Sequence, residues 1–233
     1  MDATDDQRRA RLPAAVYDLA IRLGVKPDDS RDRVRLTQTG RMKRSLDTES
    51  WMAFTATQTS MTRACEFDWL ARMGPFGMIS ARDALARGVG RLDIMALGVI
   101  PIARAKHTPA LMRGELMRYL AELPWAPAAI LLNTTLRWRE DGPDTLAVSA
   151  GAGETSSEVV LSLDGDGRIA GCFAPDRPRS ATLPYLPTPW RGRFSDYRHH
   201  GNAMWLPFAG EVAWEIDGKD VLYWQGRIEH WEG

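Results

Sequence analysis

The chain has 233 residues, enough for one large β domain or two small ones with a substantial core. Its 30 basic and 30 acidic residues give a formal net charge of zero, which argues against a nucleic-acid-binding protein, since such proteins usually carry a strongly basic face. No stretch approaches the roughly 18 apolar residues of a membrane span, and we expect a soluble protein of the bacterial cytoplasm, with an anchor outside this sequence as an open alternative.

The amino-terminal segment predicts a short helix. Apolar residues recur at helical spacing over 12–23, Pro13 suits the first turn, and Gly24 suits the end. We expect this helix to pack on the outside of the protein or on a partner chain. Residues 1–32 are therefore interpreted as an N-terminal helix and linker, and residues 33–233 as a single antiparallel β domain.

Alternation with a period of two predicts about ten strands after residue 33. It is sharpest over residues 65–73, where Trp69 shares a face with apolar neighbours and Asp68 shares the opposite face with charged ones. Hairpin turns are predicted at 164–167 and 217–219, a turn at 98–101, and an irregular proline-rich crossing at 175–193. The predicted strands are 50–59, 65–73, 76–85, 91–97, 130–140, 145–150, 157–163, 168–173, 211–216 and 221–229.

One helix interrupts these strands. Thr108 is a plausible N-cap, Pro109 occupies the first helical position, and Pro124 ends an apolar stripe, so the pattern predicts a helix over 109–123. A lone helix within a β protein usually covers the open face of the sheet. We therefore predict a mainly β fold: a curved antiparallel sheet, a half-barrel or open barrel, with this helix across its concave face. A two-sheet sandwich is the alternative.

Large apolar side chains are abundant, with nine tryptophans and ten methionines. They indicate either an ordinary β core or a pocket for an apolar or aromatic ligand. The residues that we expect to contribute to ligand binding, from the helix and the strands around it, are Trp69, Met112, Tyr119, Asn133, Arg137, Trp214 and Tyr223.

Familiar catalytic and metal-binding motifs are absent from the sequence, and Cys65 and Cys172 are too isolated for a disulfide framework or a zinc site. We expect no metal and no cofactor. Scattered residues remain as acid–base candidates, or else as solvated surface charges. They are Glu115 and Arg118 beside Glu122 on the helix, Asp68 and Arg72 beside Glu66 on a strand, and His107 before the helix.

Three runs of the sequence, 65–69, 114–122 and 189–192, resemble a widespread bacterial family known only as a domain of unknown function. The resemblance covers most of the chain after about residue 33, and its most specific motif is Gly114-Glu115-Leu116-Met117-Arg118-Tyr119-Leu120-Ala121-Glu122. It implies that the helix matters without supplying a substrate. The layout of strands and helix also looks like the curved half-barrels that carry lipoproteins and lipids, a fold-level analogy.

These patterns support three hypotheses. The first is a binding protein for a hydrophobic or aromatic small molecule in a Trp/Met-lined cavity. The second is a cofactor-independent hydrolase, lyase or isomerase, in which Glu115, Asp68 or His107 acts as base and Arg118 or Arg72 holds an anionic group. The third is an interaction module that docks through its N-terminal helix, and formation of a homo-oligomer stays open.

Overall fold

The computed structural model describes residues 3–179, 184–201 and 204–233, and its described strands form one antiparallel sheet of 13 strands. The strands are β1 (Arg33–Lys43), β2 (Trp51–Met61), β3 (Phe67–Met73), β4 (Ile79–Ala86), β5 (Val89–Ala96), β6 (Ile100–Arg104), β7 (Arg137–Gly142), β8 (Thr145–Ala150), β9 (Ser157–Leu163), β10 (Ile169–Pro178), β11 (Pro187–His200), β12 (Met204–Ile216) and β13 (Lys219–Glu232). The helices are α1 (Ala3–Arg11), α2 (Ala14–Arg22), α3 (Pro109–Ala121) and α4 (Ala128–Leu132), with the 3-10 turns η1 (Pro75–Gly77), η2 (Leu123–Trp125) and η3 (Gly153–Thr155).

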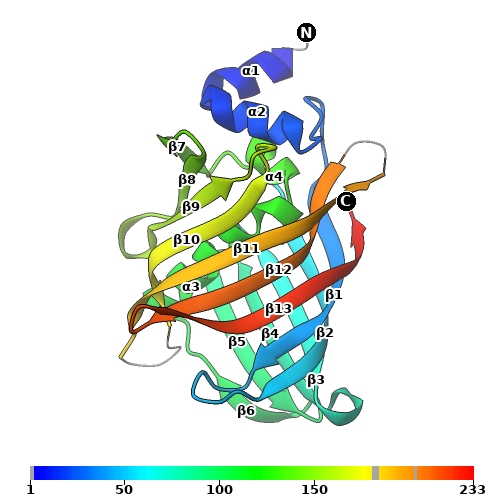
Figure 1. The fold of residues 1–233 in the computed structure, drawn as a ribbon, viewed down its shortest axis with the longest axis vertical. Coiled ribbons are helices and arrows are strands. Elements are labelled where there is room, and N and C mark those ends of the chain that lie inside the picture. The colour runs from blue at the N-terminus through cyan, green and yellow to red at the C-terminus, as the bar shows by residue number, and fades with distance from the viewer. Residues whose placement is uncertain (1–2, 180–183, 202–203) are drawn as a thin grey trace.

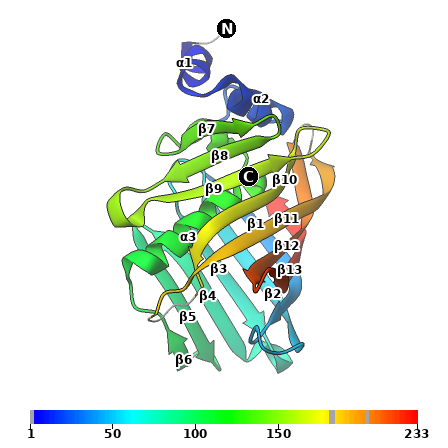
Figure 2. The ribbon, with the colours of Figure 1, turned by 60° about the vertical axis from the view of Figure 1, so that its left-hand side comes forward.

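The sheet consists of two meanders joined through the ends of the chain. Strands β1 to β6 run in sequence order from the centre to one edge, and β13 back to β7 run to the other edge. Pairing of β1 with β13 joins the two halves, whereas β6 and β7 stay unpaired with each other, so the sheet is not closed into a barrel. Figures 1 and 2 show it curving around α3. The predicted curved antiparallel sheet is confirmed.

Helix α3 bridges the two meanders from inside the curve (Figure 2). It begins where the sequence predicts, because the Thr108 hydroxyl accepts a hydrogen bond from the Leu111 amide at 3.1 Å. On one side it packs against β4 and β5, and on the other against β8, β9 and β10. We call the face that it covers the concave face.

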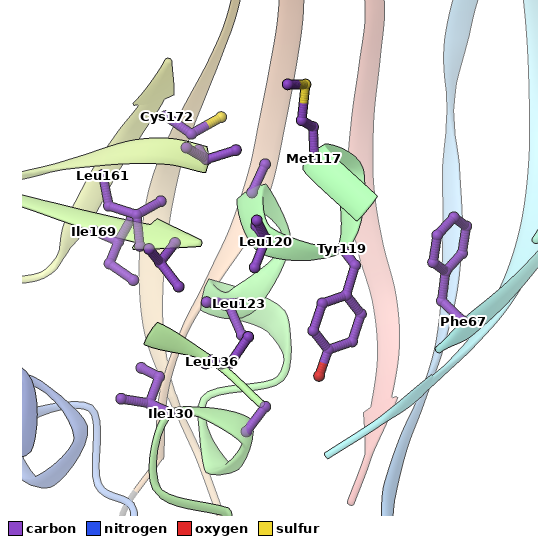
Figure 3. Close-up of a cluster of buried hydrophobic side chains, with 14 of the residues drawn as sticks. Phe67, Met117, Tyr119, Leu120, Leu123, Ile130, Leu136, Leu161, Ile169 and Cys172 are labelled. Carbon is purple, nitrogen blue, oxygen red and sulfur yellow. The ribbon is translucent and has the colours of Figure 1, made fainter. Parts of the chain in front are cut away.

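The main core joins α3, η2 and α4 to both meanders, and Figure 3 shows the part around these helical segments. Leu120, Leu123 and Ile130 from the helical segment are buried together with Leu161 and Ile169 from β9 and β10. Burying each such side chain stabilises the fold by about 1.5–3 kcal/mol. Packing therefore holds the helical segment firmly against this half of the sheet.

Glycines let aromatic rings lie flat on the centre of the sheet. Gly210, Gly226 and Gly40 are direct neighbours across β12, β13 and β1. A Cβ atom on Gly226 would lie only 2.3 Å from Cη2 of Trp224, and one on Gly210 would lie 3.0 Å from Cζ2 of Trp125. The row continues into an aromatic chain along the concave face, in which neighbouring ring centroids are 5.3–6.3 Å apart: Phe194, Trp125, Trp224, Phe54 and Trp69.

The structure corrects several predicted elements. The strand predicted from residue 130 starts as helix α4, because a short, wholly buried apolar run has no periodicity that separates helix from strand. The turn predicted at 98–101 leads into β6, where Pro101 is tolerated on an edge strand. The segment predicted as an irregular crossing at 175–193 lies partly in strands β10 and β11, whose pairing shifts register after Ala174. Its residues 180–183 lie outside the described residues.

The amino terminus holds two helices rather than the single one predicted over 12–23. Helix α2 packs on α4, and its Val16 and Leu19 belong to the main core cluster. Arg11, at the end of α1, donates a hydrogen bond to the carbonyl of Leu131 at 2.6 Å. The N-terminal helices thus cover the end of the sheet beside α4, at the top of Figure 1.

Candidate functional site

A row of polar residues crosses the concave face where the alternation calls for apolar ones. Strand register places Gln58 of β2, Trp69 of β3 and Asp83 of β4 side by side. Along β4 the residues that share this face with Asp83 are Ile79, Ala81 and Leu85. Asp83 is therefore a carboxylate at a position that faces the core. Because burying an unpaired charge is costly, it requires a buried partner.

That partner is Arg118 of α3. Its guanidinium donates to the Asp83 carboxylate, to Oε1 of Glu122 at 2.8 Å and to Oε1 of Gln58 at 3.3 Å. The side chains of Arg118, Asp83 and Glu122 are 12–15% exposed, so the ion pairs are largely shielded from water. Removing one partner of such a buried pair typically costs about 3–5 kcal/mol.

Gln58, Phe67 and Trp69 make further contacts within this polar network. Gln58 Nε2 donates to Oε2 of Glu122 at 2.6 Å and to the Ser60 hydroxyl at 3.0 Å. The guanidinium carbon of Arg118 lies 4.9 and 5.0 Å from the ring centroids of Phe67 and Trp69. Burial lowers the pKa of Arg118, but the carboxylates of Glu122 and Asp83 outweigh this effect and raise that pKa, so Arg118 remains charged.

Glu115 adds a second carboxyl group beside Asp83. Oε2 of Glu115 and Oδ1 of Asp83 are both buried, and neither has a hydrogen-bond partner among the described residues. Burial and the charge of neighbouring Asp83 raise the pKa of Glu115 well above its ordinary value. The raised pKa favours the protonated, neutral form of Glu115 beside Asp83.

The acid–base candidates from the sequence fall into separate places. Glu115 and Arg118 lie together in the buried network. Asp68 and Arg72 lie on the opposite face of β3, where Asp68 pairs with Arg82 and both side chains are 43% exposed. His107 is exposed in the loop before α3. The structure therefore does not bring Asp68, Arg72 or His107 to Glu115.

The expected ligand-binding residues likewise form several groups rather than one lining. Asn133 Nδ2 donates to the Tyr119 hydroxyl at 3.1 Å, and that hydroxyl donates to the Met61 carbonyl at 2.9 Å. The rings of Trp214 and Tyr223 stack at 5.8 Å. Trp69 lies in the polar network, Met112 is half-buried on α3, and Arg137 is exposed on β7.

Asp83 and Gln58 were missed in the sequence analysis, although a signal was present. Each interrupts an alternating series of apolar or small residues that would otherwise face the core: Phe54 and Ala56 before Gln58, and Ile79 and Ala81 before Asp83. A lone polar residue in a core series predicts a buried partner.

Two hollows that the structure describes lie away from this network. One, of about 730 Å³, is formed by β1, β2 and β10–β13 and includes Arg41, Arg193 and Arg227. The other, of about 550 Å³, is formed beside β8–β10 and includes Arg113 and Arg137. Neither contains a tryptophan or a methionine, so neither is the Trp/Met-lined cavity that the sequence suggested. Within the described residues, no group of three or more His, Cys, Asp or Glu side chains is placed to hold a metal ion.

A family model matches residues 2–226, nearly the whole chain. The chain belongs to DUF6544, a family of unknown function. The resemblance to an uncharacterised family is thereby confirmed, and it extends into the N-terminal helices. A search of curated proteins finds no match.

Among solved structures, one similar chain comes from Vibrio parahaemolyticus and bears the name of an outer membrane lipoprotein-sorting protein domain. It is 11% identical, with a TM-score of 0.49, and the match covers 97% of this chain and 89% of that one. The identity and TM-score are too low for this likeness to bear on what the present chain binds. Among the described helices, none is long and apolar enough to cross a membrane.

Proposed function

We propose that the protein binds a hydrophobic small molecule on the concave face, between α3 and the end of the sheet that carries the β1–β2, β3–β4 and β5–β6 turns. We call this end of the sheet the open end. Strand register places Phe54, Met73, Ile79 and Ala96 side by side across β2 to β5, with Met42 and Met52 as the next pair toward the open end. We call these residues, with Ile94 and Trp224, the lower concave face.

Partial exposure is the observation that carries the proposal. Met42, Met52, Ile79, Ile94 and Trp224 pack against the main core yet remain half-buried, so each keeps apolar surface within reach of solvent. Covering such surface stabilises a complex by about 25 cal/mol per Å². Methionine side chains adapt to different shapes, which favours a flexible aliphatic ligand over one rigid molecule.

The polar network limits this surface on the side of α3. Ala56, Ala71 and Ala81 form one row across β2, β3 and β4, and Gln58 and Asp83 lie two residues further along β2 and β4. Arg118 of α3 binds Asp83 from above this second row. Because Arg118 is already paired with the carboxylates of Asp83 and Glu122, the network does not require an anionic ligand. The proposed ligand therefore lies between the network and the open end of the sheet.

The test is a pair of matched substitutions. Ile79→Asn places an amide on the lower concave face, and Leu70→Asn places the same group on the outer face of β3, at a side chain 38% exposed. We expect binding of the dye 1-anilinonaphthalene-8-sulfonate to weaken at least about tenfold in Ile79→Asn, equivalent to about 1.4 kcal/mol, and to stay unchanged in Leu70→Asn. Native mass spectrometry of the purified protein would identify a bound natural ligand. Equal dye binding by both variants refutes the proposed location.

A second candidate function is acid–base catalysis by Glu115. The observation that favours it is the burial of Glu115 beside Asp83, which raises the pKa of Glu115, since a carboxyl group held neutral can serve as a general acid. An enzyme would lose turnover in Glu115→Gln while remaining folded and still binding its ligand. A binding protein would retain ligand affinity in the same variant and would show no turnover to lose.

A further inference from the structure

We propose that the end of the sheet at β3–β6 docks onto an anionic lipid surface. The docking surface, which we call the apolar rim, consists of exposed side chains on two neighbouring turns and an edge strand: Phe76, Met78, Leu97, Val99, Ile100 and Ile102. The β3–β4 and β5–β6 turns are held together by a hydrogen bond of 2.6 Å from the Leu97 amide to the Met78 carbonyl. This end lies at the bottom of Figures 1 and 2, opposite the N-terminal helices.

The exposure of the rim is extreme for side chains of this size. Phe76 is fully exposed, and Val99 and Leu97 are 74% and 61% exposed. Single exposed apolar residues are common on protein surfaces, but a contiguous set marks an interaction site. Because these side chains make little contact within the chain, the fold itself gains little from their being apolar.

Backbone geometry argues in the same direction. Phe76 and Leu97 have φ values of +55° and +51°, in the left-handed region where glycine and asparagine are favoured and bulky residues are strained. Stability of the turns alone would be served better by either of those residues. Large apolar groups at both tips are therefore explained by contact with something outside the chain.

The charge pattern favours an anionic partner. Segments 72–82 and 94–107 contain Arg72, Arg82, Arg104 and Lys106 and no Asp or Glu. Arg82 and Arg104 pair with acidic residues of neighbouring strands, whereas Arg72 is exposed beside the β3–β4 turn. A basic residue near an anionic bilayer is attracted to it. The neighbouring loop at 44–50 carries Asp47 and Glu49, so the attraction is centred on β3–β6.

Trp51 extends the pattern along the same end of the sheet. It begins β2, is half-buried, and lies under the cations of Arg41 and Lys43, whose charged groups are 4.8 and 5.8 Å from its ring centroid. Tryptophan with neighbouring Lys and Arg is typical of the interface between bilayer and water. Lys43 also pairs with Glu49 at 3.1 Å, whereas Arg41 has no acidic partner among the described residues. Apolar tips, the cation of Arg41 and an interfacial tryptophan thus occur together at one end.

The shape of the rim favours a bilayer over a second copy of the chain. Protruding turns can enter a lipid headgroup layer, whereas a stable protein interface needs a complementary face of about 800 Å² on each partner. Docking would also bring the lower concave face to the bilayer, because its row of Phe54, Met73, Ile79 and Ala96 ends at Ile100 of the rim. The proposal rests on other residues than the proposed function, so each can fail alone.

Vesicle flotation of the full chain tests the proposal. The probes are phosphatidylcholine vesicles with and without phosphatidylglycerol, and the variant is Phe76→Asn with Leu97→Asn, since asparagine tolerates positive φ. We expect the native chain to float with the anionic vesicles, less so at high salt, and the double variant to lose at least about tenfold in affinity, or about 1.4 kcal/mol. Ile21→Asn, 39% exposed on α2, is the matched control and should bind like the native chain.

Two outcomes overturn the proposal. The first is that the native chain fails to float, or that the double variant and the Ile21→Asn control float equally. The second is that the native chain forms a dimer that the double variant abolishes, without binding vesicles, which would make the rim an interface between two copies. Dye binding by the double variant separates the two proposals, because the lower concave face is intact in it.

Discussion

The raised pKa of Glu115 predicts an unusual dependence of stability on pH. A carboxyl group whose pKa is raised in the folded state binds more protons folded than unfolded between its unfolded and folded pKa values. Its stabilising effect is therefore fully present below the unfolded pKa, about 4.3, and is lost as the pH rises through the folded pKa. Within that window the slope reaches about −1.4 kcal/mol per pH unit for this one group.

Glu115→Gln isolates this contribution. The amide has the shape of the neutral carboxyl group and can donate to Oδ1 of Asp83 at every pH, so the slope that belongs to Glu115 disappears. Carboxyl groups away from Asp83 have the same surroundings in both proteins, so their contributions cancel in the difference. We expect the free energy of unfolding of the native chain, relative to that of the variant, to fall by up to about 1.4 kcal/mol per unit from pH 5 upward.

Urea unfolding followed by tryptophan fluorescence, repeated from about pH 5 to pH 9, measures this difference directly. The matched control is Glu154→Gln, on the exposed turn η3, whose profile should run parallel to that of the native chain. Parallel profiles for the native chain and Glu115→Gln would refute the reasoning, because they would mean that Glu115 ionises in the folded state as it does in the unfolded chain.

Two further predictions concern packing. Arg118→Met should lower the free energy of unfolding by about 3–5 kcal/mol in a urea titration, since it leaves Asp83 and Glu122 buried without their cation; Arg139→Met, on the exposed strand β7, is the control and should unfold like the native chain. Gly226→Ala should cost about 1–3 kcal/mol in thermal unfolding, because its Cβ would displace the Trp224 ring, and equal stability would show that the ring moves aside freely.

Local chemistry explains what could be predicted from the sequence. The Thr108 cap and Pro109 act within one turn of helix, so the start of α3 could be predicted from residues 108–111 alone. Alternation over β3 likewise shows which residues share a face. The curved sheet follows from many strands with one inserted helix.

Strand register is not local, and it accounts for most of what was missed. Nothing in β1 indicates that it pairs with β13, nearly two hundred residues away in the chain, so the route that joins the two meanders was not predicted. The same limit hid the alignment of Gln58 with Asp83. One conflict was visible beforehand: Trp69 and Asp68 are adjacent in an alternating strand, so they could not both line one cavity.

The buried network changes how α3 should be regarded. An ion-pair cluster of this kind is seldom more stable than a well-packed apolar one, but it specifies geometry, since Arg118 and Glu122 reach Asp83 and Gln58 of the sheet only when α3 lies in one position. Packing against β8–β10 fixes the opposite side of the helix. We therefore expect α3, which is anchored to both meanders, to stay in place rather than to open and close over the concave face. A ligand on the lower concave face would therefore enter from the open end, past the apolar rim, without displacing α3.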